Sequence, residues 1–344
     1  MKNILKPLIV LLALVSCAGL RADLGTGMPG PGSRYATDYF SGFDLDAMYV
    51  MERKTPRWFS WWNGPKKDTA AEQLEWADSC RAAGDFGKAR KAYDALVREW
   101  PVSPEAPLAQ KRLADVCFED ERDYIEAFEE YKYLLDYYSS QCDYAAVADR
   151  LFETAEAMRA HGKRFLFVPF ANTVGVRKAY EAAVLRAPGA AFAPKAMLAV
   201  ARLWVDDNEY GNAVSVCETL RNFHPRAPEA REALLLEADM RMKLLDFHGY
   251  NNSRARDTVL FLKAAVANPP DSEAQGHLTA CLAKAEDVAE EEAWKAAKFY
   301  DSPTRPARGA ADAYRRFAAE YPAGRHADEA RSRIAELERG NPGK

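Results

Sequence analysis

The chain has 344 residues, of which 48% are hydrophobic and 28% charged, and its formal net charge is −4. This composition is typical of a globular protein with a sizeable core, and the acidic balance argues against nucleic acid as a partner. The six cysteines show neither a CxxC pair nor metal-ligand spacing, which argues against a disulfide framework and a metal site. We expect Cys80, Cys117 and Cys217 to pack as buried free thiols.

Residues 1–16 predict a cleaved export signal, because a short lysine-containing start precedes an apolar run over 8–15 that is too short to span a bilayer. The residues LVSC, ending at Cys17, match the lipobox of bacterial lipoproteins and predict that Cys17 is lipidated and begins the mature protein. Such an anchor would hold the protein on the periplasmic face of the outer membrane of a Gram-negative-type bacterium. The alternative is ordinary cleavage after Ala22, which would leave Cys17 in the discarded peptide.

The segment 17–67 predicts a tether and an irregular aromatic region. Residues 18–34 are rich in glycine and proline, as flexible linkers are. Residues 35–63 are aromatic and end in WFSWW (58–62). These rings either cap the apolar end of the folded body, which is the interpretation we favour, or contact the membrane interface or a partner.

The stretch from Phe86 to Pro101 contains the pattern Ala-x3-aromatic-x7-Pro, with Ala89 and Tyr93 as its first two positions. The pattern is typical of the second helix of a tetratricopeptide repeat, since a small residue lets two helices approach and proline ends the helix. It recurs, with substitutions, as Ala127/Tyr131/Ser139, Val176/Tyr180/Pro188, Ala213/Cys217/Pro225, Asp257/Phe261/Pro269 and Ala310/Tyr314/Pro322. We therefore predict an all-α fold, a TPR-type helical-repeat superhelix of about six helix–turn–helix units. Repeats 1–5 would cover 68–267, and a C-terminal repeat with a capping helix would cover 268–339.

Local signals predict where helices begin, turn and end. Capping signals mark three expected starts: Thr69-x-x-Glu72, Ser103-Pro104-Glu105 and Ser272-x-x-Gln275. Turns inside the units are expected at Gly84-Asp85, Arg122-Asp123 and Asn208. A closing helix over 327–339 is expected to bury Ala330, Ile334 and Leu337 and to turn Arg331, Arg333 and Glu336 toward water.

Two insertions lengthen the array. Residues 161–175 are aromatic and β-leaning, and Pro169 breaks any helix there. The three phenylalanines of this insertion either pack across two helices, which we favour, or form an exposed recognition loop. Residues 248–253 (HGYNNS) interrupt repeat 5.

Nothing in the sequence resembles an active site. The five histidines are far apart, and no HExxH, GxSxG, P-loop or dinucleotide fingerprint occurs. The acidic runs 119–121 and 290–292 are interpreted as solvated helix faces. We predict a protein that is not an enzyme, with no catalytic residues, no cofactor and no metal.

The repeat register predicts which side chains of the first helices line the concave surface of a superhelix. These candidate peptide- or partner-binding residues are Leu74, Asp78, Arg81, Arg112, Glu119, Lys195, Leu198 and Arg202. A mixture of charges and leucines suits an extended peptide better than a small metabolite.

The lipobox at Cys17 and the units of the form Gly84-x-Phe86-x2-Ala89-x3-Tyr93-x7-Pro101 together resemble a known family, and residues 293–337 match it more closely still. Over about residues 68–339 the chain is similar to the BamD-type (YfiO-like) tetratricopeptide lipoproteins of the outer-membrane β-barrel assembly machinery. The chain differs from them in its long aromatic preface and in the insertion 161–175. The resemblance implies docking on the periplasmic part of the barrel-inserting subunit and handling of unfolded outer-membrane proteins by the N-terminal repeats.

Three functions follow as hypotheses. The first is a non-enzymatic periplasmic scaffold in outer-membrane β-barrel assembly. The second is a periplasmic TPR adaptor that coordinates cell-wall or envelope complexes, like the repeat domain of Tol–Pal-associated coordinators. The third is an envelope enzyme such as a peptidoglycan lytic factor, against which the absence of a catalytic constellation in the sequence argues.

Overall fold

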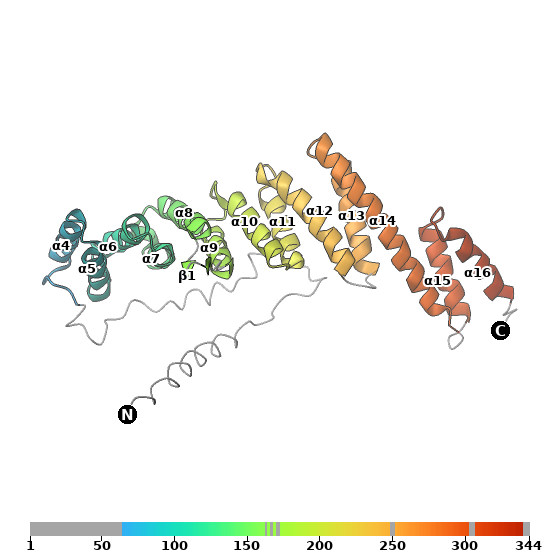
Figure 1. Cartoon of the computed structure of the whole chain (residues 1–344), viewed down its shortest axis with the longest axis horizontal. Helices are drawn as coiled ribbons and strands as arrows, with labels where there is room; N and C mark the ends of the chain where they lie inside the picture. The colour runs from blue at the N-terminus through green and yellow to red at the C-terminus, as the bar shows by residue number, and fades with distance from the viewer. Residues whose placement is uncertain are drawn as a thin grey trace, which may run out of the picture. The chain divides into compact units, whose positions relative to one another are not determined.

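The computed structural model describes residues 64–161, 164–165, 168–169, 173–247, 252–302 and 307–339. The predicted signal, the lipobox at Cys17, the tether and the WFSWW segment lie outside these residues, as do parts of both predicted insertions. The described part is all-α apart from one short hairpin, which confirms the predicted fold class (Figure 1).

The helices follow one another as antiparallel-type pairs joined by short turns, and each helix packs on the next. The pairs are α4 (Ala70–Ala82) with α5 (Phe86–Glu99), α6 (Ala106–Asp115) with α7 (Tyr124–Tyr137), α8 (Tyr144–His161) with α9 (Thr173–Arg186), α10 (Ala193–Asp206) with α11 (Tyr210–Phe223), α12 (Glu229–Phe247) with α13 (Asn252–Ala267), and α14 (Ser272–Tyr300) with α15 (Ala307–Glu320). The last helix is α16 (Ala327–Arg339), α6 continues into a π-helical turn η1 (Val116–Asp120), and a 3₁₀ turn η2 (Ser139–Gln141) follows α7. We call each helix pair a unit, and we call its two helices, in chain order, the first helix and the second helix.

The turns inside three units share one backbone conformation. Gly84, Arg122 and Asn208 adopt left-handed φ angles of 76°, 55° and 62°. Each lies two residues before the first residue of a second helix, at the positions that the sequence predicted. The amide that follows Gly84 donates back to the Cys80 carbonyl at 2.9 Å, and the amide that follows Asn208 does the same to the Trp204 carbonyl at 2.9 Å. This is the helix-ending geometry that glycine adopts without strain and asparagine tolerates.

The first two positions of the repeat pattern, a small residue and an aromatic residue, lie in the core in most units, as predicted. Ala89 and Tyr93 are completely buried. The corresponding buried residues of other units are Ala127, Tyr131, Val176, Tyr180, Ala213, Cys217, Ala310 and Tyr314. Packing a small residue beside a large one brings the two helices of a unit together and fixes the register of each second helix.

The predicted register of repeat 5 is wrong by one residue. Asp257 is exposed and Phe261 is only half-buried. The buried positions of α13 are instead Thr258 and Leu262. The ring of Phe261 lies beside guanidinium groups, with Arg241 at 4.6 Å from its centroid, so it packs against charge at the edge of the core.

The start of the first unit is as predicted, and the start of the second is not. The Thr69 hydroxyl accepts a 3.3 Å bond from the Glu72 amide and caps α4. Ser103 is not the cap of α6, because the helix begins at Ala106; Glu105 occupies the N-cap position without a side-chain capping bond, and Pro107 rather than Pro104 is the proline of the first turn. Proline at this position costs no hydrogen bond, since the amides of the first turn have no partner within the helix.

The predicted cap of the long helix α14 is also one residue off. Asp271, not Ser272, is the capping residue, and its carboxylate accepts a 2.8 Å bond from the Ala274 amide. An aspartate at this position satisfies an amide and also places negative charge at the positive end of the helix. The same carboxylate pairs with Arg231 of α12, which ties this helix start to the preceding unit.

The insertion in repeat 3 contains a hairpin of two-residue strands. β1 (Arg164–Phe165) pairs with β2 (Val168–Pro169) in antiparallel register. The side chains of its three phenylalanines, Phe165, Phe167 and Phe170, lie outside the described residues.

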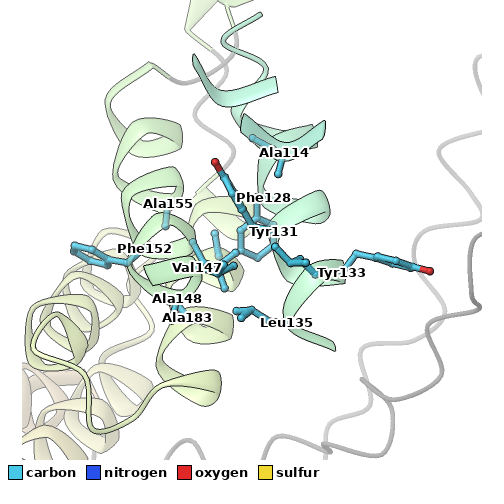
Figure 2. Packing of buried hydrophobic residues seen from close by; sticks show 14 of the residues in the cluster. Ala114, Phe128, Tyr131, Tyr133, Leu135, Val147, Ala148, Phe152, Ala155 and Ala183 are labelled. Carbon is cyan, nitrogen blue, oxygen red and sulfur yellow. The ribbon is translucent and has the colours of Figure 1, made fainter. Parts of the chain in front are cut away.

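One apolar core extends from α4 to α12 and is built from both helices of the first four units and from α12. Figure 2 shows its middle, where Tyr131 from α7 meets Val147 from α8 and where Phe152 of α8 lies nearby. The Phe152 ring stacks on Phe192, at 4.8 Å between centroids, and so joins α8 to the start of α10. Cys117 and Cys217 are completely buried in this core, as predicted, while Cys80 is half-buried.

The C-terminal units have their own apolar clusters, and α14 contributes to two of them. The first part of α14 packs with α12 and α13 through Leu278 and Cys281. Its last turns pack with α15 and α16 through Trp294. A helix of 29 residues can reach both clusters because it is about 40 Å long at 1.5 Å per residue.

The closing helix α16 buries the face that the sequence predicted. Ala330 is completely buried, and Ile334 and Leu337 pack against the same cluster. Arg333, however, does not simply face water: its Nε donates to Asp301 at 2.7 Å. The periodicity places this residue at the edge of the buried face, where an aliphatic stem packs and a charged end finds a carboxylate.

Candidate functional site

A hydrogen bond from a buried tyrosine to a carboxylate recurs within four units. The phenol of Tyr93 donates to Asp78 at 2.6 Å, and the phenol of Tyr131 donates to Asp115 at 2.7 Å. The same contact forms between Tyr180 and Glu156 at 2.5 Å and between Tyr314 and Asp301 at 3.0 Å. Each tyrosine comes from the second helix, and each carboxylate comes from the first helix or its end. We call these four contacts the tyrosine–carboxylate pairs.

The tyrosine–carboxylate pairs fix where negative charge lies on the first helices. Burial, followed by the charge of Asp115, raises the pKa of Tyr131 well above its usual value. The phenol therefore stays protonated and keeps donating even above the pH at which an exposed tyrosine ionises. A carboxylate held by a buried donor cannot change rotamer freely, so the first-helix surface carries acidic groups at set positions.

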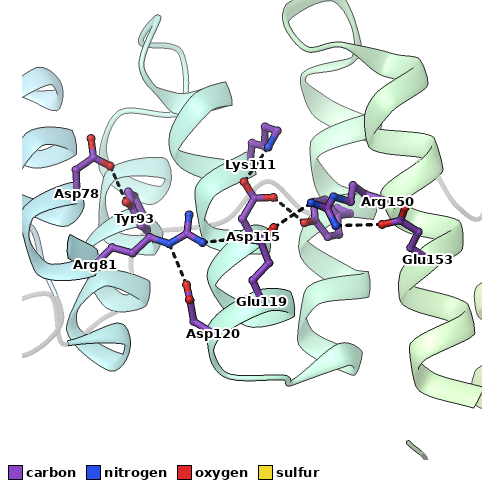
Figure 3. Close-up of polar contacts among 10 residues, drawn as sticks. Asp78, Arg81, Tyr93, Lys111, Asp115, Glu119, Asp120, Arg150 and Glu153 are labelled. Atoms are coloured by element: carbon purple, nitrogen blue, oxygen red, sulfur yellow. Dashed lines mark hydrogen bonds and ion pairs between the residues drawn. The ribbon is translucent and has the colours of Figure 1, made fainter. Parts of the chain in front are cut away.

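Arginines of neighbouring units bind these and nearby carboxylates. Arg112 of α6 pairs with the second oxygen of Asp78 on α4. Arg81 of α4 donates to Glu119 at 2.9 Å and to Asp120 at 2.9 Å (Figure 3). The other oxygen of Glu119 accepts a 2.9 Å bond from Arg150 of α8. Four of the predicted residues, Asp78, Arg81, Arg112 and Glu119, thus belong to two neighbouring sets of ion pairs, Asp78 with Arg112 and Arg81 with Glu119, Asp120 and Arg150, which together cross three units; we call these contacts the charged row.

Lys195 and Arg202 lie on α10 and belong to neighbouring contacts of the same type. The Lys195 ammonium lies 3.6 Å from Glu156 of α8. Arg202 binds Glu232 of α12, with its Nε at 3.1 Å. Both side chains are more than half exposed, 57% for Lys195 and 54% for Arg202. They extend the charged row along the first helices from α4 to α12.

The two predicted leucines do not present free apolar surface. Leu198 is buried at 4% exposure, and Leu74 is half-buried against the main core. The register that turns polar residues of these helices outward also turns the leucines toward the second helices. The candidate surface is therefore more polar than the sequence predicted.

The acidic runs are bound to neighbouring elements, which corrects their interpretation as solvated faces. Glu121 accepts from Arg90 of α5 at 2.9 Å, and Glu119 and Asp120 belong to the charged row. In the second run, Glu291 accepts from His326 at 3.2 Å. The π-helical turn η1 widens the end of the first helix and directs three successive acids toward neighbouring helices.

A small aromatic pocket is a second feature, which the sequence analysis did not find. Its lining residues are Pro101, Val102, Tyr133, Tyr137, Tyr138 and Gln141, and its volume is about 160 Å³. The rings of Tyr133 and Tyr137 stack at 4.3 Å, and the Tyr138 phenol donates to the Pro101 carbonyl at 2.8 Å. The tyrosine-rich run at the end of α7 was the available signal. A pocket of this size accepts one apolar side chain rather than a metabolite.

Within the described residues, no helix is both long enough and apolar enough to cross a membrane.

The polar groups of the charged row bind one another as ion pairs, and their arrangement supplies charges of both signs. Such a surface can exchange its internal pairs for those of a polypeptide.

The helix pairs, their left-handed turns and their buried small and aromatic anchors define the class of the protein: it is an all-α tetratricopeptide-type repeat protein. No protein-family model matches the sequence, and no curated protein matches it. Among solved structures, it is similar to a tetratricopeptide repeat protein from Parabacteroides merdae, with 14% identity and a TM-score of 0.30, over 78% of this chain and 98% of that one. It is also similar to the P58(IPK) TPR domain, with 14% identity and a TM-score of 0.25, over 78% of each chain.

Proposed function

We propose that the protein is a non-enzymatic scaffold that is lipid-anchored at Cys17 on the periplasmic face of the outer membrane. There it would bind subunits of the β-barrel assembly machinery and unfolded outer-membrane proteins during barrel assembly and insertion. The repeat fold supports the general role, because stacked helix pairs offer an extended surface to protein partners. The lipobox and the resemblance to BamD-type lipoproteins support the particular one.

The charged row is the observation that carries the binding proposal. Its groups are partly exposed, with Arg81 at 27% and Glu119 at 41%, so a partner can reach them. Solvent-accessible ion pairs contribute only about 0–1 kcal/mol each, and a bound polypeptide can therefore replace them at little cost. The tyrosine–carboxylate pairs hold two of the acidic members, Asp78 and Glu156, in place, which lowers the entropy that these side chains lose on binding.

Affinity purification from detergent-solubilised envelopes tests the proposal. The tagged full-length protein should co-purify with the barrel-inserting subunit. Recovery of cell-wall proteins alone would support the alternative, a periplasmic TPR adaptor that coordinates cell-envelope complexes. Hydrolysis of isolated peptidoglycan by the purified protein would contradict both.

The membrane anchor has its own test. Replacing Cys17 by serine should leave the precursor unprocessed or move the protein to the soluble fraction, because a lipidated cysteine anchors through its buried acyl chains. Mass spectrometry of the mature protein distinguishes the alternatives. An unmodified N-terminus at Asp23, the residue after Ala22, would contradict lipidation.

A further inference from the structure

Three metal-ligating side chains of different chemistry meet where α12 packs on α14. The Nε2 atom of His277 lies 2.8 Å from Oδ1 of Asp239 and 3.7 Å from Sγ of Cys281. All three ligand atoms lie within 4.8 Å of one another. His277 and Cys281 come from α14, four residues apart, and Asp239 comes from α12. Asp239 is 38 residues away from His277 in the sequence, so the fold alone brings the three side chains together.

We propose that Asp239, His277 and Cys281 form a Zn²⁺ site that links α12 to α14, with water as the fourth ligand. Imidazole, thiolate and carboxylate are the three protein ligands that zinc uses, at about 2.0–2.3 Å in tetrahedral geometry. Ligand atoms around such an ion lie roughly 3.3–3.8 Å apart by these bond lengths. The sulfur–nitrogen separation already has this value. The carboxylate oxygen must withdraw from the imidazole by about half an ångström and must come to within about 3.8 Å of the sulfur, from which it lies no more than 4.8 Å away.

The surroundings of the three residues suit a bound ion. Cys281 is 8% exposed and belongs to the apolar cluster of α12, α13 and α14, so its position is fixed by packing. The His277 side chain is 43% exposed, which leaves a path for the ion from solvent. One carboxylate and one thiolate carry two negative charges, which a divalent ion neutralises. The Cys281 thiol must lose its proton to bind the ion as a thiolate.

This junction pairs Arg231 of α12 with Asp271 and Glu273 at the start of α14, as the earlier junctions pair arginines with carboxylates, but at Asp239 its chemistry differs. The contacts from α4 to α12 use the guanidinium or ammonium of Arg112, Arg150, Lys195 and Arg202 against carboxylates. At the α12–α14 junction the partner of Asp239 is an imidazole with a thiol beside it. A guanidinium can pair with a carboxylate but cannot bind a metal, whereas imidazole and thiolate can.

The site would act as a clamp between repeat 5 and the C-terminal unit. α14 contributes to both C-terminal apolar clusters, so fixing it on α12 also fixes the unit that contains α15 and α16. A metal that binds only the folded protein raises the free energy of unfolding. The increase grows with the logarithm of the ratio of the metal concentration to Kd. This inference is independent of the proposed function, because it concerns neither the charged row nor the membrane anchor.

Cobalt and zinc titrations of the reduced full-length chain test the site. Co²⁺ should give a thiolate-to-cobalt charge-transfer absorption, and Zn²⁺ should displace it and raise Tm. Cys281→Ser should abolish the absorption. His277→Asn and Asp239→Asn should each weaken Co²⁺ binding at least about 10-fold, since even changes outside the first coordination shell cost this much.

Two matched controls make the test specific. Cys142→Ser removes a half-buried thiol elsewhere, and His326→Asn removes a histidine that binds carboxylates on α14 and α16. Both variants should keep the absorption and the affinity. His277 and Asp239 are partly exposed, so their variants should remain folded by circular dichroism. Absence of the absorption in the wild-type chain, or an unchanged Co²⁺ affinity in the folded His277→Asn and Asp239→Asn variants, would overturn the proposal.

Discussion

Tyr131 of α7 donates a buried 2.7 Å hydrogen bond to Asp115 of α6, and Lys111 binds the second oxygen of the same carboxylate at 2.8 Å. The tyrosine that fills the space between the two helices of a unit thus also orients an acid of its first helix. A tyrosine at this position therefore both packs between the two helices and fixes the position of a carboxylate. This explains why the aromatic position recurs as tyrosine in four units, where phenylalanine would fill the same space.

Replacing Tyr131 by phenylalanine should lower the free energy of unfolding by about 1.5–3 kcal/mol, the range for a hydrogen bond to a charged group. The ring and its packing remain, so the loss reports the phenol alone. Tyr210→Phe, which removes an exposed bond to Asn208, is the matched control and should cost less than about 0.5 kcal/mol. Urea unfolding of the two variants measures the difference. Equal losses of unfolding free energy in the two variants would show that the buried hydrogen bond stabilises the protein no more than the exposed one.

Replacing Ala89 or Ala213 by leucine should destabilise the protein by about 1–3 kcal/mol. Both alanines are completely buried where the two helices of a unit meet, and extra methylenes must push the helices apart. Ala82→Leu, at an exposed position of α4, should change stability by less than about 0.5 kcal/mol. An unchanged Tm in Ala89→Leu would show that the assigned register is wrong.

Two glycines three residues apart should respond in opposite directions to alanine. Gly84 has a φ of 76°, so Gly84→Ala introduces a strained left-handed residue and should cost about 1 kcal/mol. Gly87 lies in α5 with open space where the methyl group of an alanine would project, so Gly87→Ala should stabilise by roughly 0.5 kcal/mol. Thermal unfolding monitored by circular dichroism compares them. A stabilising Gly84→Ala would contradict the turn geometry.

The stabilising effect of Asp271 should disappear in acid. Its hydrogen bond with Arg231, followed by that with the Ala274 amide, lowers the pKa of the carboxyl from 3.8 to about 2. A carboxyl whose pKa is lower in the folded state stabilises that state above its unfolded pKa, and the stabilisation is lost as the pH falls through the folded pKa. The Tm difference between wild type and Asp271→Ala should therefore be largest above about pH 4 and shrink toward pH 2. A difference that is independent of pH over this range would contradict a charged cap.

The sequence was sufficient to predict the helical fold because its signals are local. Ala89 and Tyr93 are four residues apart on one helix, and Gly84 marks the preceding turn, so all three can be recognised within one unit. The repeat pattern predicts the wrong register for repeat 5, because it places the aromatic ring of Phe261 in the core. In the structure Leu262, one position later, is the buried residue. Burial depends on the neighbouring helices, which a single-helix pattern does not contain.

The polar contacts of the site could not be predicted, because they join residues that are far apart in the sequence. Arg81 and Glu119 were both placed on the candidate surface, but their bond spans 38 residues and depends on how two units stack. For the same reason Asp239 could not be matched to His277 and Cys281. The π-helical turn at η1, which directs Glu119 toward two neighbours, also has no signature in the sequence.

Site-specific photocrosslinking in cells tests the central claim most directly. A photoreactive residue at Lys195, exposed on the first helix α10, should crosslink to a subunit of the barrel assembly machinery or to an unfolded barrel protein. The same residue at Lys178, exposed on the second helix α9, is the matched control and should give no such product. Crosslinks to assembly partners from Lys195 but not from Lys178 are the predicted result. Crosslinks from Lys178 alone, or only to cell-wall proteins from Lys195, would contradict a first-helix surface that serves barrel assembly.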